Sequence, residues 1–221
     1  MVRPDVLLCL GEEWSEFEAA MDAAGLDSPG DTHAHRTFTA QVRDGVLCLA
    51  GGLSSAIVET SLWELSRAGQ VERIMLVGTA GALPGYRGAF GAPHLMDPAT
   101  SVHQNFEPPV GWTGSPTWDV QLPAKECISV DRFYGFSPVT LAEYPAEQAL
   151  KDEWSKWKDH DAFVDMEVAA FYWYAERFGF QTYAAIKAAA NPLSDLDSLP
   201  ESSHAVVHSV VAAAVDTLLS G

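Results

Sequence analysis

The stretch AFVDMEVAAFYWYAERFG, residues 162–179, passes directly from one kind of buried element into another. Residues 162–166 are a short apolar run, which predicts a buried strand. Residues 167–178 are apolar on nearly every side and end before Gly179, which predicts a buried helix. Glu167 lies between the two elements, where a carboxylate is costly unless it has partners. We predict that Glu167 contacts a ligand, although a helix-cap contact could also satisfy it.

The same alternation of strand and helix fills most of the chain. Further strands are predicted at residues 5–10, 45–50, 73–77, 126–130 and 182–189, and further helices at 12–24, 54–68, 146–158 and 201–219. The proline-rich middle, residues 85–123, predicts only loops and short strands. Helices between strands imply crossover connections, so we predict an α/β fold with a mostly parallel sheet and a site at the carboxyl ends of its strands.

Length, charge and cysteine content limit the class of protein. The 221 residues, 48% of them hydrophobic, are enough for one domain, residues 1–221. A formal net charge of −17 would repel phosphate backbones and anionic bilayers, so we expect neither nucleic acid nor membrane as a partner. No segment approaches the roughly 20 apolar residues of a membrane span. Three widely spaced cysteines favour a reduced, cytoplasmic protein.

Two other segments follow predicted strands. Gly11-Glu12-Glu13-Trp14 places acidic residues in the first turn of a helix, where they commonly complement the helix dipole. Val77-Gly-Thr-Ala-Gly-Ala82 lacks both the Lys-Ser/Thr of a P-loop and the spacing of a dinucleotide fingerprint, and predicts a tight strand-to-loop turn. The histidines lack the paired spacing of a metal site, so we predict no metal and no cofactor.

Taken in order, these segments resemble the nucleoside phosphorylase and nucleosidase family over nearly the whole chain. The closest branches are the adenosylhomocysteine/methylthioadenosine nucleosidases and the futalosine hydrolases. Residues 165–170 (DMEVAA) look like the family's Glu-Met-Glu-Ala stretch, and residues 78–81 (GTAG) and 130–134 (VDRFY) support the likeness. The resemblance implies a three-layer α/β/α sandwich with a central mixed, mostly parallel sheet. It also implies a homo-oligomer that binds a small-molecule purine nucleoside.

The resemblance further implies which residues hold the ribose and the base. Glu167 would accept hydrogen bonds from the ribose hydroxyl groups, and Met166 would pack beneath the sugar. Phe133 would stack on the base, while the backbone near Tyr134 would read its edge. The loop beside base and sugar would be lined by Thr79, Ala80 and Gly81.

Cleavage of the glycosidic bond passes through an oxocarbenium-like transition state, which nearby carboxylates stabilise. By resemblance, Glu13 would orient or deprotonate the attacking water, with Glu12 as the alternative. Asn191 stands where adenine-releasing relatives have an aspartate that protonates the purine. An amide cannot protonate it but can hydrogen-bond a 6-oxopurine. If Asp195 reaches the site instead, an adenine nucleoside is expected; Asn191-Pro192 could also merely turn the chain.

The ribosyl group could be transferred to water or to phosphate, and the absence of two arginines indicates water. The family's phosphorylases bind phosphate with arginines after the first strand and just before the glycine turn, where this chain has Glu12-Glu13 and Leu76-Val77. The resemblance therefore implies a hydrolase acting on N-glycosyl compounds. Phosphorolysis is the alternative, with Arg87 as the residue that would favour it. A second alternative is a non-catalytic nucleoside-binding or storage protein, because Lys187 and Asn191 depart from the common hydrolase pattern.

Overall fold

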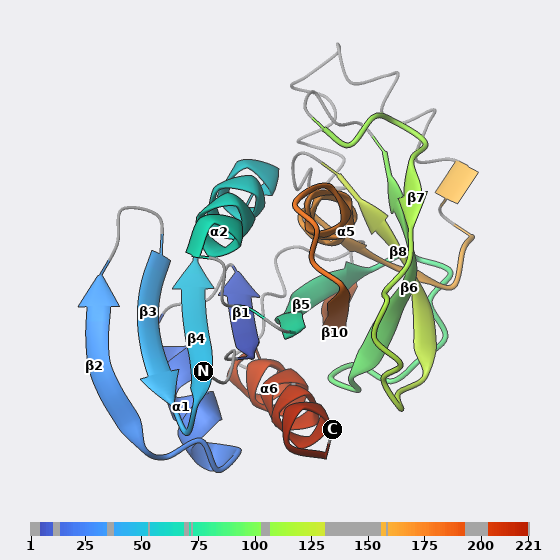
Figure 1. The fold of residues 1–221 in the computed structure, drawn as a ribbon. Helices are drawn as coiled ribbons and strands as arrows, with labels where there is room; N and C mark the ends of the chain where they lie inside the picture. The colour runs from blue at the N-terminus through green and yellow to red at the C-terminus, as the bar shows by residue number, and fades with distance from the viewer. Residues whose placement is uncertain are drawn as a thin grey trace, which may run out of the picture.

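A mixed β-sheet with helices on both faces forms the framework of the protein (Figure 1). The computed structural model describes residues 5–10, 14–34, 38–52, 54–68, 71, 73–102, 107–130, 156–157, 159–192 and 203–220. The strands are β1 (Val6–Leu10), β2 (Pro29–Ala34), β3 (Phe38–Arg43), β4 (Val46–Gly51), β5 (Arg73–Ala82), β6 (His94–Ser101), β7 (Thr113–Gly114), β8 (Ala124–Ser129), β9 (Ala162–Asp165) and β10 (Thr182–Pro192). The helices are α1 (Trp14–Ala23), α2 (Ser55–Ala68), α5 (Val168–Arg177) and α6 (Ser203–Ser220).

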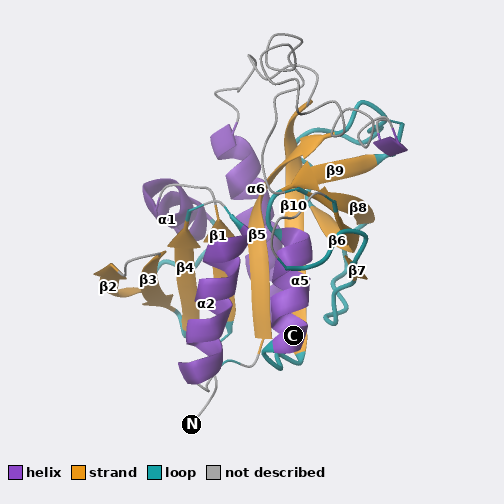
Figure 2. Ribbon diagram, turned by 90° about the horizontal axis from the view of Figure 1, so that it is seen from above, coloured by secondary structure: helices purple, strands orange, loops and turns teal. Residues whose placement is uncertain are grey.

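The centre of the sheet is parallel and its flanks contain the antiparallel pairings. Strands β4, β1, β5 and β10 lie side by side in parallel, while β2 and β3 extend the β4 edge as an antiparallel hairpin. On the other flank, β10 pairs with β6, β6 with β8, β8 with β9, and β9 returns to β5. These five strands therefore form a closed ring, which places the ends of β5, β9 and β10 beside one another (Figure 2).

The central strands, such as β1 and β5, are buried on both faces because a helical layer covers each face. In β1, Leu7 and Cys9 pack in the apolar cluster that contains Phe17 of α1 and Val207 of α6. The alternate residues, including Leu8, pack in the cluster of α2 and α5. The predicted three-layer α/β/α fold with a mixed sheet is confirmed (Figure 1). No helix in the described part of the chain is long and apolar enough to cross a membrane.

Most of the expected helices and strands are present. Two expected turns, in segments that contain glycine or proline, are strand in the structure. The predicted turn at residues 78–81 is wrong: β5 continues through it, because β10 pairs with residues 78–81 and β9 pairs with Gly81 and Ala82. Similarly, β10 runs to Pro192, so Asn191-Pro192 does not turn the chain. The hairpin of β2 and β3 was not predicted. The expected helix at 146–158 lies almost wholly outside the described residues.

One buried side chain, Arg43, ties the β2–β3 hairpin region to α1. Its guanidinium group donates to Glu18 Oε1 at 2.9 Å and to the Leu26 carbonyl oxygen at 2.8 Å, and it also contacts Asp22. The side chain is 2% exposed, whereas those of Glu18 and Asp22 are 38% and 55% exposed. Loss of Arg43 therefore leaves carboxylates that water can still reach.

We expect Arg43→Met to lower the free energy of unfolding by about 1.5–3 kcal/mol, the range for hydrogen bonds to charged groups. Urea unfolding measures this change. The matched control is Arg177→Met, because Arg177 pairs with Glu107 at 2.8 Å with side chains 55% and 49% exposed. Such a surface pair contributes about 0–1 kcal/mol. Equal losses in the two variants would contradict the role assigned to Arg43.

Candidate functional site

The carboxyl ends of β5 and β10 meet the end of β9, and several predicted site residues meet there. Gly81 of β5 is the register partner of Asn191 on β10 and of Val164 on β9. Glu167 follows Val164 by three positions, at the start of α5. The ladder of β5 and β10 shifts register between Ala189 and Asn191, and such bulges are frequent next to active sites. The fold thus brings residues 79–81, the backbone of Asn191 and the segment before α5 to one place.

Glu167 occupies the N-cap position of α5 but does not cap the helix with its side chain. The cap is supplied by Asp165, whose Oδ2 accepts a hydrogen bond from the Val168 backbone N–H at 3.0 Å. Glu167 Oε2 accepts a long bond of 3.3 Å from the Met166 N–H. The helix-cap explanation for the buried carboxylate is therefore wrong.

The principal partner of Glu167 is Lys187 of β10. The Lys187 Nζ atom lies 2.9 Å from Glu167 Oε2 and 3.0 Å from Asp165 Oδ2. All three residues are 1% exposed. In the sequence, Lys187 stands out only as a departure from the common hydrolase pattern. Its position in the apolar strand predicted at residues 182–189 was the available signal, because a buried lysine requires a paired carboxylate.

Asp165 is held by its own set of donors. Its Oδ1 accepts a bond of 2.6 Å from Ser129 Oγ and a weaker contact of 3.4 Å from Cys127 Sγ, both on β8. Ser129 Oγ in turn accepts the Ala169 N–H at 2.9 Å. Burial raises the pKa of the Cys127 thiol well above its ordinary value, so this cysteine remains a neutral donor. Asp165 is consequently fixed between β8, α5 and Lys187.

The two charged partners respond differently to burial. Burial raises the pKa of Glu167; Lys187 opposes this change, and the nearby Asp165 adds to it. Burial lowers the pKa of Lys187, but Asp165 and Glu167 together overcome that effect and leave it raised. The asymmetry arises because one ammonium group has two carboxylates, whereas each carboxylate shares one ammonium. The three groups in their charged forms carry a net charge of −1, which suits a ligand that develops positive charge.

One oxygen atom of this ion-pair network is an acceptor without a hydrogen-bond donor among the described residues. Glu167 Oε1 is buried and has no hydrogen-bond partner among the described residues. An unpaired carboxylate oxygen out of contact with water is costly, so a donor is expected to complete it. Nearby, Met166 and Thr79, whose carbonyl oxygen contacts Lys187, are only partly buried. Oε1 is therefore the acceptor of this network that a hydroxyl group of a ligand would complete.

The remaining predicted residues lie outside this description. Glu13, Phe133, Tyr134 and Asp195 are outside the described residues, and of Asn191 only the backbone position is described. Their predicted roles remain predictions.

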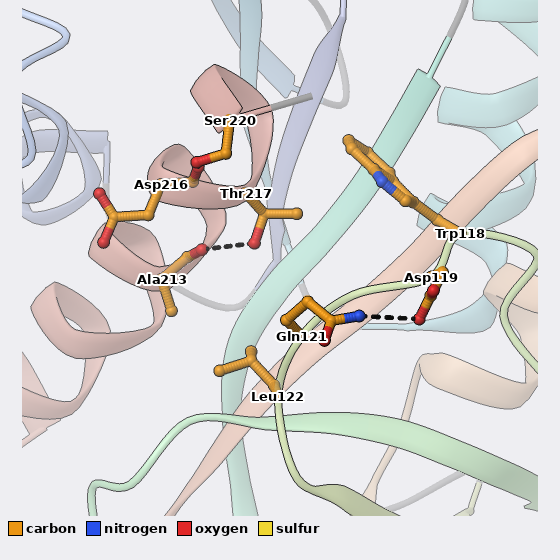
Figure 3. Close-up of a pocket in the computed structure, with 8 residues that line it drawn as sticks. All are labelled: Trp118, Asp119, Gln121, Leu122, Ala213, Asp216, Thr217 and Ser220. Atoms are coloured by element: carbon orange, nitrogen blue, oxygen red, sulfur yellow. Dashed lines mark hydrogen bonds between the residues drawn. The ribbon is translucent and has the colours of Figure 1, made fainter.

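A separate pocket has a volume of about 470 Å³ (Figure 3). It lies between the segment before β8 and the last turns of α6, and it is lined by Trp118, Asp119, Gln121, Leu122, Ala213, Asp216, Thr217 and Ser220. The Trp118 ring packs under Arg73, and its backbone N–H donates to the Tyr183 carbonyl oxygen at 3.1 Å. Arg73 and Tyr183 mark the amino ends of β5 and β10, so this pocket is at the opposite end of the strands.

Comparison with known proteins gives matches in structure. No family model matches the chain, and no curated protein matches it by sequence. The 5′-methylthioadenosine/S-adenosylhomocysteine nucleosidase from Neisseria meningitidis, in complex with methylthio-immucillin-A, is 14% identical, with a TM-score of 0.69 and coverage of 98% of this chain and 100% of that one. Futalosine hydrolase of Helicobacter pylori is 12% identical, with a TM-score of 0.64 and coverage of 96% and 97%.

A third structure agrees with these two. S-adenosylhomocysteine nucleosidase from Streptococcus pyogenes, in complex with 5-methylthiotubericidin, is 14% identical, with a TM-score of 0.68 and coverage of 99% and 97%. The chain has the nucleosidase fold. At these identities the match establishes the fold, and it spans nearly all of each chain.

The raised pKa of Glu167 predicts a pH dependence of stability. Because its folded pKa lies above the unfolded value of about 4.3, the folded chain binds this proton more tightly than the unfolded chain does. The stability contributed by Glu167 is therefore present at low pH and lost as pH rises from the unfolded to the folded pKa. Glu167→Gln removes this component.

Urea unfolding of both proteins from about pH 4 to about pH 7 tests the sign of this effect. We expect the wild type to lose stability relative to Glu167→Gln as the pH rises. The control is Glu176→Gln, on the exposed side of the same helix. A difference between wild type and Glu167→Gln that does not change with pH would show that Glu167 titrates normally.

Proposed function

We propose that the protein is a nucleosidase that hydrolyses the N-glycosidic bond of a purine nucleoside and releases the free base and a ribose derivative. The observation that carries the proposal is the buried carboxylate of Glu167, whose Oε1 has no partner among the described residues, at the end of β9. The ribose 2′- and 3′-hydroxyl groups are donors of the kind that this atom requires. The shared fold with nucleosidases supports the assignment.

The proposed reaction breaks the bond between ribose C1′ and the purine nitrogen and forms a bond between C1′ and a water oxygen. Glu167 would stabilise the positive charge that develops on the ribose, because its carboxylate lies in a buried setting where charge interactions are strong. Glu13 would take the proton that the water loses. The departing base gains a proton from solvent water, and Asn191 would favour a 6-oxopurine by hydrogen-bonding its ring nitrogen and its oxygen together.

Water is the proposed acceptor, and the position of Arg87 supports it. The Arg87 backbone N–H donates to Asp161 Oδ1 at 2.9 Å, and Asp161 directly precedes β9. Glu167 lies beyond the other end of that strand. Arg87 is therefore fixed at the start of β9, which does not favour its use as a phosphate ligand beside Glu167.

Incubation of the purified protein with inosine, futalosine, 5′-methylthioadenosine and S-adenosylhomocysteine, with and without phosphate, tests the proposal. Free base is followed by chromatography. We expect release without phosphate, and a decrease of roughly 10²–10³-fold in kcat for Glu167→Gln, as for loss of one transition-state contact. Glu176→Gln is the matched control and should retain activity.

Each other outcome has a defined meaning. Release that requires phosphate would make the protein a phosphorylase. Binding of a nucleoside without release of base from any of the four compounds would contradict the enzymatic proposal and favour the nucleoside-binding alternative. Preference for inosine and futalosine would agree with Asn191 as a base contact, whereas preference for the two adenine nucleosides would argue for Asp195.

A further inference from the structure

Lys187 is a buried cation inside an apolar layer. On β10 the alternate residues Tyr183, Ala185 and Ala189 belong to the apolar cluster that faces α2 and α5, and Lys187 occupies the position between them. Gly78, its register partner on β5, lies beside the side chain: an added Cβ there would be in van der Waals contact with Lys187, 3.7 Å from Nζ and 3.9 Å from Cε. The ammonium group is thus enclosed close to the backbone of β5.

All hydrogen-bond donors of Lys187 are used within the protein. An ammonium group has three donors and no acceptor. Nζ lies 2.9 Å from Glu167 Oε2, 3.0 Å from Asp165 Oδ2 and 3.3 Å from the Thr79 carbonyl oxygen. No donor remains for a ligand. Lys187 can therefore affect a bound molecule through Glu167, and it is not placed to bind the molecule itself.

The same contacts give the two carboxylate oxygens of Glu167 different hydrogen-bond partners. Oε2 accepts from Lys187 and from the Met166 N–H, while Oε1 accepts from none of the described residues. Asp165 is fixed in position, because its carboxylate accepts hydrogen bonds from Ser129, Cys127 and the Val168 N–H. Lys187 therefore pairs with the fixed carboxylate of Asp165 on one side and with the carboxylate of Glu167 on the other.

The charged and titratable groups that face Glu167 in the described part of the chain come from three strands. They are Asp165 on β9, Lys187 on β10 and the thiol of Cys127 on β8, while β5 contributes the Thr79 carbonyl oxygen. Asp165 repels the ionised form of Glu167, and burial also disfavours it. Lys187 is the one cation among these groups that opposes both effects.

We propose that Lys187 is a positioning residue for Glu167: it keeps the carboxylate ionised and fixes Oε2, so that Oε1 is presented to the ribose hydroxyl groups. This role rests on the proposed function for its catalytic consequence, but the effect of Lys187 on Glu167 is independent of turnover.

The test compares Lys187→Met with the wild type over a range of pH. Without the ammonium group, Glu167 should protonate more readily, so the acid limb of kcat should move to higher pH by about 1 to 3 pH units, the usual effect of an adjacent opposite charge. Near neutral pH we expect kcat to fall by roughly 10²-fold, with partial recovery at alkaline pH. A purely structural role would lower kcat by the same factor at every pH, and that result would overturn the proposal.

Two further variants separate charge from folding. Lys187→Arg keeps the positive charge and should leave the acid limb near its wild-type position even if kcat falls. Lys125→Met is the matched control, since Lys125 also pairs with an aspartate, Asp161 at 2.9 Å, but away from Glu167. It should change neither kcat nor its pH dependence.

A readout without turnover distinguishes failure of this proposal from failure of the proposed function. In protein labelled with ¹³C at glutamate carboxyl groups, the resonance lost in Glu167→Gln should titrate at higher pH in Lys187→Met than in the wild type. If the wild type cleaves no nucleoside but this titration moves, the proposed function fails and the positioning role stands. An unmoved titration together with an unmoved acid limb would overturn the positioning role.

The wild type alone supplies a measurement if the variants do not fold. In ¹⁵N-lysine-labelled protein, the Lys187 ammonium should be charged at neutral pH and its protons should exchange slowly, because all three are hydrogen-bonded. A neutral amine, or rapid exchange like that of an exposed lysine, would contradict the positioning role.

Discussion

A buried ammonium group between two buried carboxylates joins the parts of the fold that form the candidate site. Lys187 lies on β10, Asp165 ends β9, and Glu167 begins α5, so the ion pairs connect two strands that flank β5 with the helix that follows one of them. Removal of Lys187 would leave two carboxylates without a compensating charge in an apolar layer. The same feature that connects these elements also sets the direction and charge of the carboxylate proposed to bind the ribose.

The sheet topology makes this arrangement possible. Because β5, β9, β8, β6 and β10 close into a ring, β9 and β10 both pair with β5, and the last residues of β5 have partners on both sides. The small residues 78–81, which pair with β10, border the site, and the Thr79 carbonyl oxygen contacts Lys187. Gly78 is the clearest case, because the space of its missing side chain is next to the Lys187 ammonium. The separate pocket beside Trp118 has no part in this arrangement and lies at the opposite end of the strands.

The sequence predicted the elements whose signal is local. Apolar runs located the buried strands, and apolar spacing located α1. The burial cost of Glu167 singled it out as a ligand candidate without knowledge of any partner. The glycine-rich segment 78–81 was read as a turn, because nothing in its own residues shows that two other strands will pair with it. Local composition cannot report a constraint that comes from residues about 80 to 110 positions away.

The ion pair was missed for a similar reason. Lys187 stood out as polar in an apolar strand, but its contact with Glu167 depends on the register between β10 and β5 and on the ring closure through β9. The role of Asp165 as the helix cap was also hidden, since Asp165 and Glu167 are both acidic residues near the same helix start. Pairing of distant strands, rather than the residue types themselves, decides which carboxylate caps and which remains available.

The most direct test of the account is a crystal structure of the protein with a purine C-nucleoside, whose carbon–carbon glycosidic bond cannot be hydrolysed. We expect the ribose beside Glu167, with a hydroxyl group within hydrogen-bond distance of Oε1 and with the Lys187 contacts to Glu167 and Asp165 unchanged. A ribose bound elsewhere, for example in the pocket beside Trp118, or one held by Lys187 itself, would contradict it.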